Sequence, residues 1–485
     1  MIVPPSGYTA VGPPETPLDW LAYLYGKLTK RLPLIQGYGE YYEGEQQQLA
    51  FAQLRYREEF REVFAQWRDN FCGLIVDSST ERLGVDGFRM PDATGTDRDA
   101  RFIWQRNSMD AFSNSVHLDA LVQGQSFILV WADKHGQPAI TPVSAEHMAI
   151  QYKPGSLAEL EAAARFYHDD WGRHWVTLWT STYVYEATLG TAGWEQGVQR
   201  PNPLGVVPVV PFTNRTRLVG SPHSDLANIV PIQDAINKVV SDALTASEFA
   251  AFPQRYVTGL EIQEDEDGRP IEPFRVAVDK LLQAEDPAAR FGSFTVADLG
   301  NYVTLVSMLV QHMASISRVP PTYFLVNAAS APSGESILSF EAGLVAKVRQ
   351  LMLYFGESWE QVIRLCFAVK RDKRARAFSM ETTWRDPEYR TEAQHVDALL
   401  KLKQLNVPEE QLWSDAGYSP AQIATFREMR KADARAAAEI ARLEPQPKSI
   451  TGVASTPNEK KAAEMASKIP QGNSGNINRK LNEQR

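Results

Sequence analysis

The chain has 485 residues, and its 59 Asp and Glu outnumber its 50 Lys and Arg, which gives a net charge of −9 at pH 7. This acidity argues against a protein that grips nucleic acid through bulk positive charge, although it allows one that lets a polyanion pass. Hydrophobic residues at 44% and charged residues at 22% lie near globular averages, which excludes a mostly disordered chain.

The two cysteines, Cys72 and Cys366, belong to no CxxC pair, which argues against a disulfide framework and a cysteine-rich zinc site. A reducing compartment fits this usage. Residues 1–5 lack the basic and apolar regions of a signal peptide, and the apolar run 127–132 is too short to cross a bilayer. We therefore expect no leader and no membrane partner.

Residues 1–50 are rich in Pro, Gly, Tyr and Gln and predict an extended arm with a short helix near residues 18–32, with an ordinary ordered loop as the alternative. Residues 51–220 mix helical and strand periodicity and predict one α+β domain. The expected helices are 54–76 and 99–124, and the expected strands are 126–132, 138–143, 175–179, 183–189 and 206–212.

The pattern changes at residue 221. An apolar stripe from 226 to 250 predicts a helix, which Pro231 either begins or kinks. Residues 254–297 predict a small strand-rich unit. A second apolar stripe predicts a helix over residues 298–317, stopped by the prolines that follow.

Small residues at 327–334 precede a helical pattern over 335–370, which at about 1.5 Å per residue is roughly 50 Å long. A short strand is expected at 380–384, and residues 391–442 are helical in pattern throughout. Residues 444–485 contain no aromatic residue and carry a net charge of +3, which predicts a tail that is disordered in isolation.

Catalytic motifs are sparse: the sequence has no GxxxxGK[ST] phosphate loop, no GxSxG elbow and no HExxH zinc motif. The acidic run Glu264–Asp267 resembles part of an EF-hand loop but fails on ligand spacing, which favours a solvated hairpin tip. His168 and His174 lie near Asp169 and Asp170, either as a metal site or, in the interpretation we favour, as polar residues of a turn.

Two further patterns have two interpretations each. The basic cluster 370–376 indicates either a nucleic-acid contact or the charged C-terminal end of a helix, and the second is favoured. Trp171, Trp175 and Trp179 indicate either a stacking platform or alternate core residues of a strand, and the core is again favoured. With so few catalytic elements, a chain of this length is more typical of a structural or assembly protein.

The order of segments resembles the portal proteins of tailed double-stranded DNA bacteriophages, of the siphophage type. A helix, a small β insertion, a second helix, a loop of small residues and a very long helix follow one another. The resemblance covers roughly residues 35–440 and includes five short matches of local sequence. These are Tyr41–Gly44, Ile103–Asn107, Ala251–Gly259, Val319–Leu325 and Ser333–Ser336.

The resemblance implies an elongated α+β subunit of a ring of about twelve copies, located in the virion at the portal vertex between capsid and tail and assembled in the host cytoplasm. It implies the following parts: an N-terminal arm (1–50), a wing (51–220), a first stem helix (221–251), a clip (252–297), a second stem helix (298–317), a tunnel loop (318–334), a long helix with a wing strand (335–390), a crown (391–443) and a flexible tail (444–485).

The same resemblance implies a channel for DNA packaging and ejection, with no catalytic, metal or cofactor site. Terminase, and later a head-completion or adaptor protein, would dock at the clip through Glu264, Asp265, Glu266 and Asp267. The tunnel loop would face DNA through Asn327, Ala328, Ala329, Ser330 and Ser333. Major capsid and scaffolding proteins would be further partners.

Two alternatives remain open at this level. One is another structural or adaptor protein of the virion. The other is a hydrolase with a site assembled from distant residues, for which His168 or His174 with nearby acids would be the candidates.

Overall fold

The structure of the protein is a computed structural model. It describes residues 12–45, 69–90, 95–190, 193–194, 197–215, 217–218, 220–251, 255–259, 290–293, 298–324, 334–388, 392–418 and 420–443. The chain divides into two compact units, one formed by residues 1–408 with 415–417 and the other by residues 409–414 with 418–485. Most of the described helices and all of the described strands belong to the first unit.

The centre of the first unit is a three-stranded antiparallel sheet with the order β10-β2-β3, formed by Val209–Thr213, Gln125–Ala132 and Pro138–Ser144. One face of β2 packs on helices, and its other face packs on a second sheet. This burial on both faces explains why β2 is an unbroken apolar run. Pro208 and Pro211 accompany β10, and β10 is an edge strand as predicted.

The second sheet of this unit is antiparallel and six-stranded, with the order β4-β5-β6-β7-β8 and with β9 also paired to β7. Its strands are Met148–Tyr152, Leu160–His168, His174–Thr180, Tyr183–Gly190, Gly193–Trp194 and Val198–Pro201. The predicted hairpin of β6 and β7 is confirmed, whereas β4 and β5 were not expected. In β5, Ala163 faces the three-stranded sheet, while Ala162 and Ala164 face a helix.

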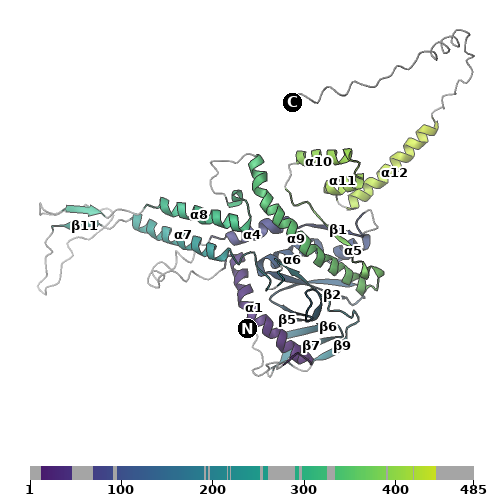
Figure 1. The fold of residues 1–485 in the computed structure, drawn as a ribbon, viewed down its shortest axis with the longest axis horizontal. Coiled ribbons are helices and arrows are strands. Elements are labelled where there is room, and N and C mark those ends of the chain that lie inside the picture. The colour runs from purple at the N-terminus through teal and green to yellow at the C-terminus, as the bar shows by residue number, and fades with distance from the viewer. Residues whose placement is uncertain are drawn as a thin grey trace, which may run out of the picture. The chain divides into compact units, whose positions relative to one another are not determined.

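That helix is α1, Pro17–Glu43, and it corrects the prediction of an extended arm over residues 1–50. Thr16 caps the helix by accepting from the Asp19 backbone, Asp19 accepts in return from Thr16, and Pro17 occupies the first position. The helix is stabilised by its apolar stripe, which is buried on the six-stranded sheet (Figure 1). The stripe consists of Trp20, Leu21, Leu24, Tyr25 and Leu28.

Three short helices and a two-stranded sheet complete this region: α4 (Phe71–Thr80), α5 (Arg98–Arg106), α6 (Met109–Gln123) and β1 (Val85–Arg89) with β13 (Glu381–Trp384). The single helix expected over residues 99–124 is wrong, because Ser108 has a left-handed backbone with φ 56° and separates α5 from α6. The expected strand near residues 380–384 is confirmed as β13.

The long helix is α9, Gly334–Val369, and it packs with α6 against the three-stranded sheet (Figure 1). Aromatic rings interlock at this contact. The Trp359 ring lies 4.9 Å from Trp104 and 4.6 Å from Phe212, measured between ring centroids. The helix predicted over 335–370 is therefore confirmed, and its residues from Leu344 to Phe367 contribute to the main core of the unit.

Two helices, α7 (Val230–Ala251) and α8 (Gly300–Ser317), run side by side (Figure 1). Pro231 lies in the first turn of α7, so it begins the helix and does not kink it. Strand β11 (Arg255–Thr258) follows α7 and pairs with β12 (Arg290–Ser293), and the short helix η1 (Pro321–Phe324) follows α8.

Helix α10 (Glu392–Gln404) belongs to the first unit, so the boundary between the units falls inside the predicted crown 391–443. The second unit contains most of α11 (Glu409–Asp415) and all of α12 (Pro420–Leu443). Arg427 makes two 2.7 Å hydrogen bonds to Glu410 and so links these two helices. Within the described part of the chain, no helix is long and apolar enough to cross a membrane.

Candidate functional site: the α7–α8 helix pair and its base

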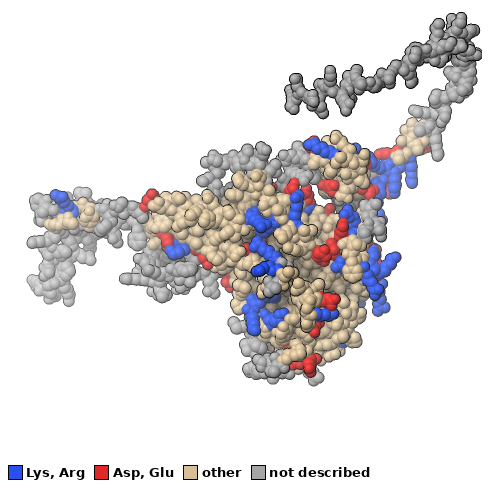
Figure 2. Space-filling view, viewed as in Figure 1, with Lys and Arg blue, Asp and Glu red and all other residues tan. Residues whose placement is uncertain are grey.

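Helix α8 has an apolar face that no other described element covers. The sequence from Gly300 to Ser317 contains no Asp, Glu, Lys or Arg. Leu305, Met308 and Ile316 share one side of the helix and are 40%, 43% and 48% exposed. The α8 surface is accordingly almost free of charge colours in Figure 2. An uncharged apolar helix face of this kind is typical of a contact with another protein chain.

Helix α7 is fixed to the body of the first unit by polar contacts in its first two turns. Tyr41 of α1 donates to Asp234 at 2.7 Å. Burial raises the pKa of Tyr41, and the Asp234 carboxylate raises it further. The Gln233 side chain donates to the Asp69 carbonyl at 2.8 Å and accepts from the Phe71 amide at 3.0 Å, which fixes α7 to the start of α4.

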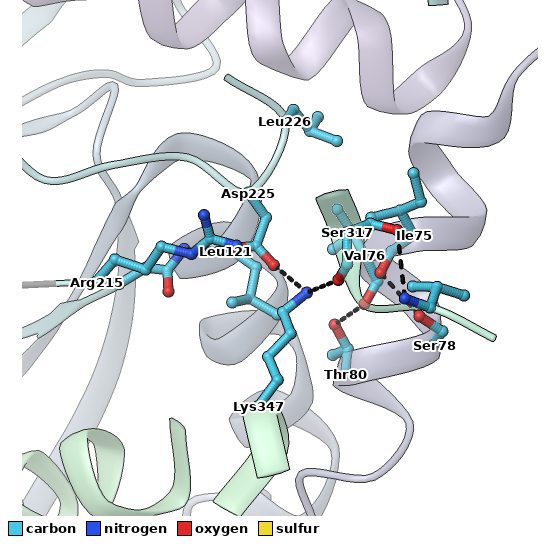
Figure 3. A network of polar contacts seen from close by, with 12 residues as sticks. Ile75, Val76, Ser78, Thr80, Leu121, Arg215, Asp225, Leu226, Ser317 and Lys347 are labelled. Carbon is cyan, nitrogen blue, oxygen red and sulfur yellow. Dashed lines mark hydrogen bonds and ion pairs between the residues drawn. The ribbon is translucent and has the colours of Figure 1, made fainter. Parts of the chain in front are cut away.

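The base of the helix pair contains a buried ion pair between Asp225 and Lys347 (Figure 3). The Lys347 Nζ lies 2.6 Å from Asp225 Oδ2, and these side chains are 7% and 1% exposed. Asn214 and Arg215, which follow β10, contact the other oxygen of Asp225 at 2.9 Å and 3.2 Å. The Asp225 amide donates to the Leu121 carbonyl at 2.9 Å, at the end of α6.

Lys347 also donates to the Ser317 carbonyl at 3.4 Å, which is the last carbonyl of α8. A cation at this position is favoured by the negative end of the helix dipole. Burial alone would raise the pKa of Asp225, but the charges of Lys347 and Arg215 hold it below its usual range. One lysine of α9 therefore binds the chain just before α7 and the chain at the end of α8.

The residues predicted to contact DNA and clip partners are outside the described residues. These are Asn327, Ala328, Ala329, Ser330 and Ser333, and Glu264, Asp265, Glu266 and Asp267. The structure does describe what flanks them. The strands β11 and β12 flank the acidic run, and η1 and α9 flank the loop of small residues.

The histidines of the hydrolase alternative face each other across β5 and β6, with 6.2 Å between the ring centroids of His168 and His174. Asp169 accepts from the Arg173 and Trp171 amides, and from the Arg173 and Trp175 side chains, as the organiser of a tight turn. Burial acts to raise the pKa of Asp169, but these hydrogen bonds outweigh it and lower the pKa to about 2. Among the described residues, no three His, Cys, Asp or Glu side chains form a metal-binding group.

The basic cluster 370–376 includes one arginine that is used structurally. Arg374 pairs with Asp97 at 2.9 Å, Asp99 at 2.6 Å and Asp372 at 2.7 Å. These contacts tie the segment that follows α9 to the start of α5, which supports the structural interpretation for this residue. The tryptophans do not form one platform, because Trp179 is buried while Trp171 is 79% exposed.

An acidic recess of about 510 Å³ lies between α1 and α6. Its lining includes Glu40, Glu43, Glu45, Asp119 and Glu146 and no basic residue. Burial raises the pKa of Asp119 to about 6, and the Glu146 carboxylate adds to the shift while a hydrogen bond from Ser144 opposes it. The lining disfavours a phosphate ligand.

Sequence reasoning missed the Asp225–Lys347 pair. The two residues are far apart in the chain, and neither belongs to a local motif. The only sequence signal was a lysine within the apolar pattern of the long helix, which indicates a charge that needs a buried partner.

Comparison with known proteins identifies the family. The family described as "Phage portal protein, SPP1 Gp6-like" matches residues 21–436. The portal proteins of Mycobacterium phages L5 and D29 are each 30% identical over 393 residues, which cover 75% of this chain and 78% of theirs.

Two solved structures show weaker likeness. The neck of an empty gene transfer agent particle gives a TM-score of 0.41 at 12% identity and covers 67% of this chain and 90% of its own. The virion of the native gene transfer agent particle gives a TM-score of 0.38 at 13% identity and covers 76% of this chain and 91% of its own. On the sequence matches, the chain belongs to the SPP1 Gp6-like family of phage portal proteins, which confirms the predicted α+β portal protein that forms a ring at the capsid vertex.

Proposed function

We propose that this protein forms a ring of about twelve copies whose channel carries double-stranded DNA during packaging and ejection, and that it has no catalytic activity. The observation that supports a contact between subunits of the ring is the exposed apolar face of α8. A head-to-tail contact between identical subunits closes into a ring when the rotation between neighbours closes. The uncharged face of α8 suits such a contact, because burying it leaves no unpaired charge.

The net charge supports passage of DNA without retention. Each subunit carries −9, so a ring multiplies this charge into a strongly anionic body. Each contact of a Lys or Arg with a phosphate would add affinity through counterion release, and an acidic wall avoids this.

We place the docking of terminase, and later of a head-completion or adaptor protein, at the clip. This segment follows the C-terminal end of α7 and precedes α8, at the opposite end of the helix pair from the Asp225–Lys347 base. The acidic run Glu264–Asp267 offers charge for a basic partner. Contacts with major capsid and scaffolding proteins, and assembly in the host cytoplasm, complete the proposal.

The oligomer is tested first, by native mass spectrometry and electron microscopy of the purified protein at several salt concentrations. We expect a closed ring with a central channel. A persistent monomer, with no ring in procapsids or virions, would overturn the proposal.

Two variants test the channel and the clip. Deletion of Asn327–Ser330 should leave ring assembly intact and reduce DNA packaging or retention, so normal packaging would reject the loop's role. Reversal of the four charges Glu264–Asp267 should weaken capture of terminase and adaptor in a pull-down. Unchanged capture would remove the acidic run from the docking surface.

A further inference from the structure

Two polar contacts join the end of α8 and the residues after it to the first half of α9. We call these two segments, residues 317–324 and 334–348, the two limbs. The first joins the Ser317 carbonyl to Lys347. The second joins Tyr323 to Glu341 through the guanidinium of Arg82. Ser317 lies six residues before Tyr323, and Lys347 lies six residues after Glu341, so both contacts join the same two segments, which flank residues 325–333.

Arg82 follows α4 and is buried, with a side chain only 2% exposed. Its Nη2 donates to the Tyr323 hydroxyl at 2.7 Å and to Glu341 Oε1 at 3.2 Å, and its Nη1 donates to the Pro387 carbonyl at 3.0 Å. Three segments that are distant in sequence therefore meet at one planar group. A lysine cannot reproduce this, because it presents a single point charge and no fork.

Apolar contacts fix the same limb up to its last described residue. Val319 is buried, and the ring of Phe324 lies 5.5 Å from the ring of Phe71 on α4. On the other limb, Leu344, Val345 and Val348 of α9 are buried. The limbs are therefore held from residue 324 backward and from residue 341 onward.

We propose that Arg82 is a positioning residue: by holding Tyr323 and Glu341 together, it fixes the spacing of the two segments that flank residues 325–333, and DNA packaging depends on this spacing. The inference rests on the proposed function for the role of the segment, but the bracing itself is a property of one subunit.

The test measures the distance across the base within one subunit. Thr322→Cys and Ser339→Cys place nitroxide labels on two exposed positions, one on each limb, while the native Cys72 and Cys366 are buried and remain unlabelled. Labelled subunits are diluted into unlabelled rings, and the width of the distance distribution is read by pulsed electron paramagnetic resonance. DNA packaging is assayed with the same variants, free of labels.

We expect Arg82→Met to widen the distribution at least twofold, Arg82→Lys to widen it nearly as much, and Tyr323→Phe to widen it less. Arg89→Met is the matched control, because Arg89 forms an exposed ion pair with Glu381 on the adjacent strand and should leave the width unchanged. If Arg82→Met does not fold, Arg82→Lys and Tyr323→Phe carry the test.

An unchanged width in folded Arg82 and Tyr323 variants would overturn the inference. A wider distribution with reduced packaging in intact rings supports both the bracing and the channel role. A wider distribution with normal packaging keeps the bracing and rejects the loop's role in the channel. Because the distance lies within one subunit, it is measurable even in a protein that forms no ring, so the two failures are distinguishable.

Discussion

Apolar side chains are buried in the core around α9, whereas several are exposed on α8 of the α7–α8 helix pair. Around α9, Trp104, Phe212 and Trp359 interlock, and even the buried His117 accepts a 2.9 Å hydrogen bond from Trp359. In the helix pair, Leu305 and Met308 stand exposed on a helix without a charge. The core is buried within one chain, whereas the helix pair keeps an exposed apolar face, which a neighbouring chain would cover in the proposed ring. An average hydrophobic content for the whole chain conceals this difference.

The largest expected effect comes from charging the open face. In Leu305→Glu with Met308→Glu, two carboxylates would enter the subunit contact, where desolvation of an unpaired charge is costly. We expect loss of the ring in native mass spectrometry, with the unfolding free energy of the subunit changed by only about 0.5 kcal/mol.

Leu157→Glu is the control, because Leu157 is exposed in a turn of the body, between β4 and β5. It should leave the ring unchanged. A ring that survives the double charge on α8 would place the subunit contact elsewhere.

The second effect tests the Asp225–Lys347 ion pair, which links the helix pair to α9. Lys347→Met leaves the Asp225 carboxylate buried without its main partner, and removal of one member of a buried pair typically costs about 3–5 kcal/mol. Lys238→Met, which breaks the exposed pair with Asp242 on α7, should cost no more than about 0.5 kcal/mol. Urea unfolding of the subunits measures the free energy of unfolding of both variants. Equally small losses in the two would show that the Asp225–Lys347 pair contributes little to stability.

The third effect is a pH dependence that belongs to the core. Burial lowers the pKa of His117 to about 3, so the unfolded chain takes up a proton there between pH 6.5 and 3 and the folded chain does not. Stability should therefore be full above pH 6.5 and fall below it, by up to about 1.4 kcal/mol per pH unit.

His117→Gln keeps an acceptor for Trp359 but does not titrate, so its stability should fall less steeply between pH 6 and 4 in urea titrations. Asp119, whose pKa is raised to about 6, acts in the opposite sense in the folded state, so Asp119→Asn should steepen the fall. Parallel pH profiles for wild type and His117→Gln would contradict this assignment.

The smallest expected effect concerns one residue in each region whose backbone is left-handed. Arg371 at the end of α9 and Arg318 at the end of α8 have φ of 57° and 61°, in the left-handed region that favours glycine. Replacing either by glycine should stabilise the subunit by about 0.5–1 kcal/mol. Thermal unfolding of the two variants checks this. A loss at Arg318 alone would mean that its side chain makes contacts that outweigh the strain.

Elements with a strong local period were predictable from the sequence. The stripe of α8, the length of α9 and the pair β2–β3 all follow from regular apolar spacing. Helix α1 was underestimated because Pro33 and three glycines interrupt its pattern, although the Thr16–Asp19 cap was readable. Strand β5 was missed because alanine is a poor strand former, and here its small size allows packing on both faces.

The site was predictable only where it lies within one segment. The helix pair was expected, but the residues that anchor it come from positions more than 100 residues apart, such as Asp225 with Lys347 or Arg82 with Pro387. Such contacts leave no local spacing in the sequence. The roles of the acidic run and of the loop of small residues stay predictions.

The pairing of β1 with β13 has a consequence for synthesis. Val85 meets Trp384, so about 300 residues must leave the ribosome before this sheet can close. At about 5–20 residues per second, that delay is on the order of 15–60 s. Helix α8 with its apolar face emerges within this interval, before the strand that completes the body. A nascent chain would therefore expose the surface proposed to contact neighbours before the β1–β13 sheet of its own body has formed.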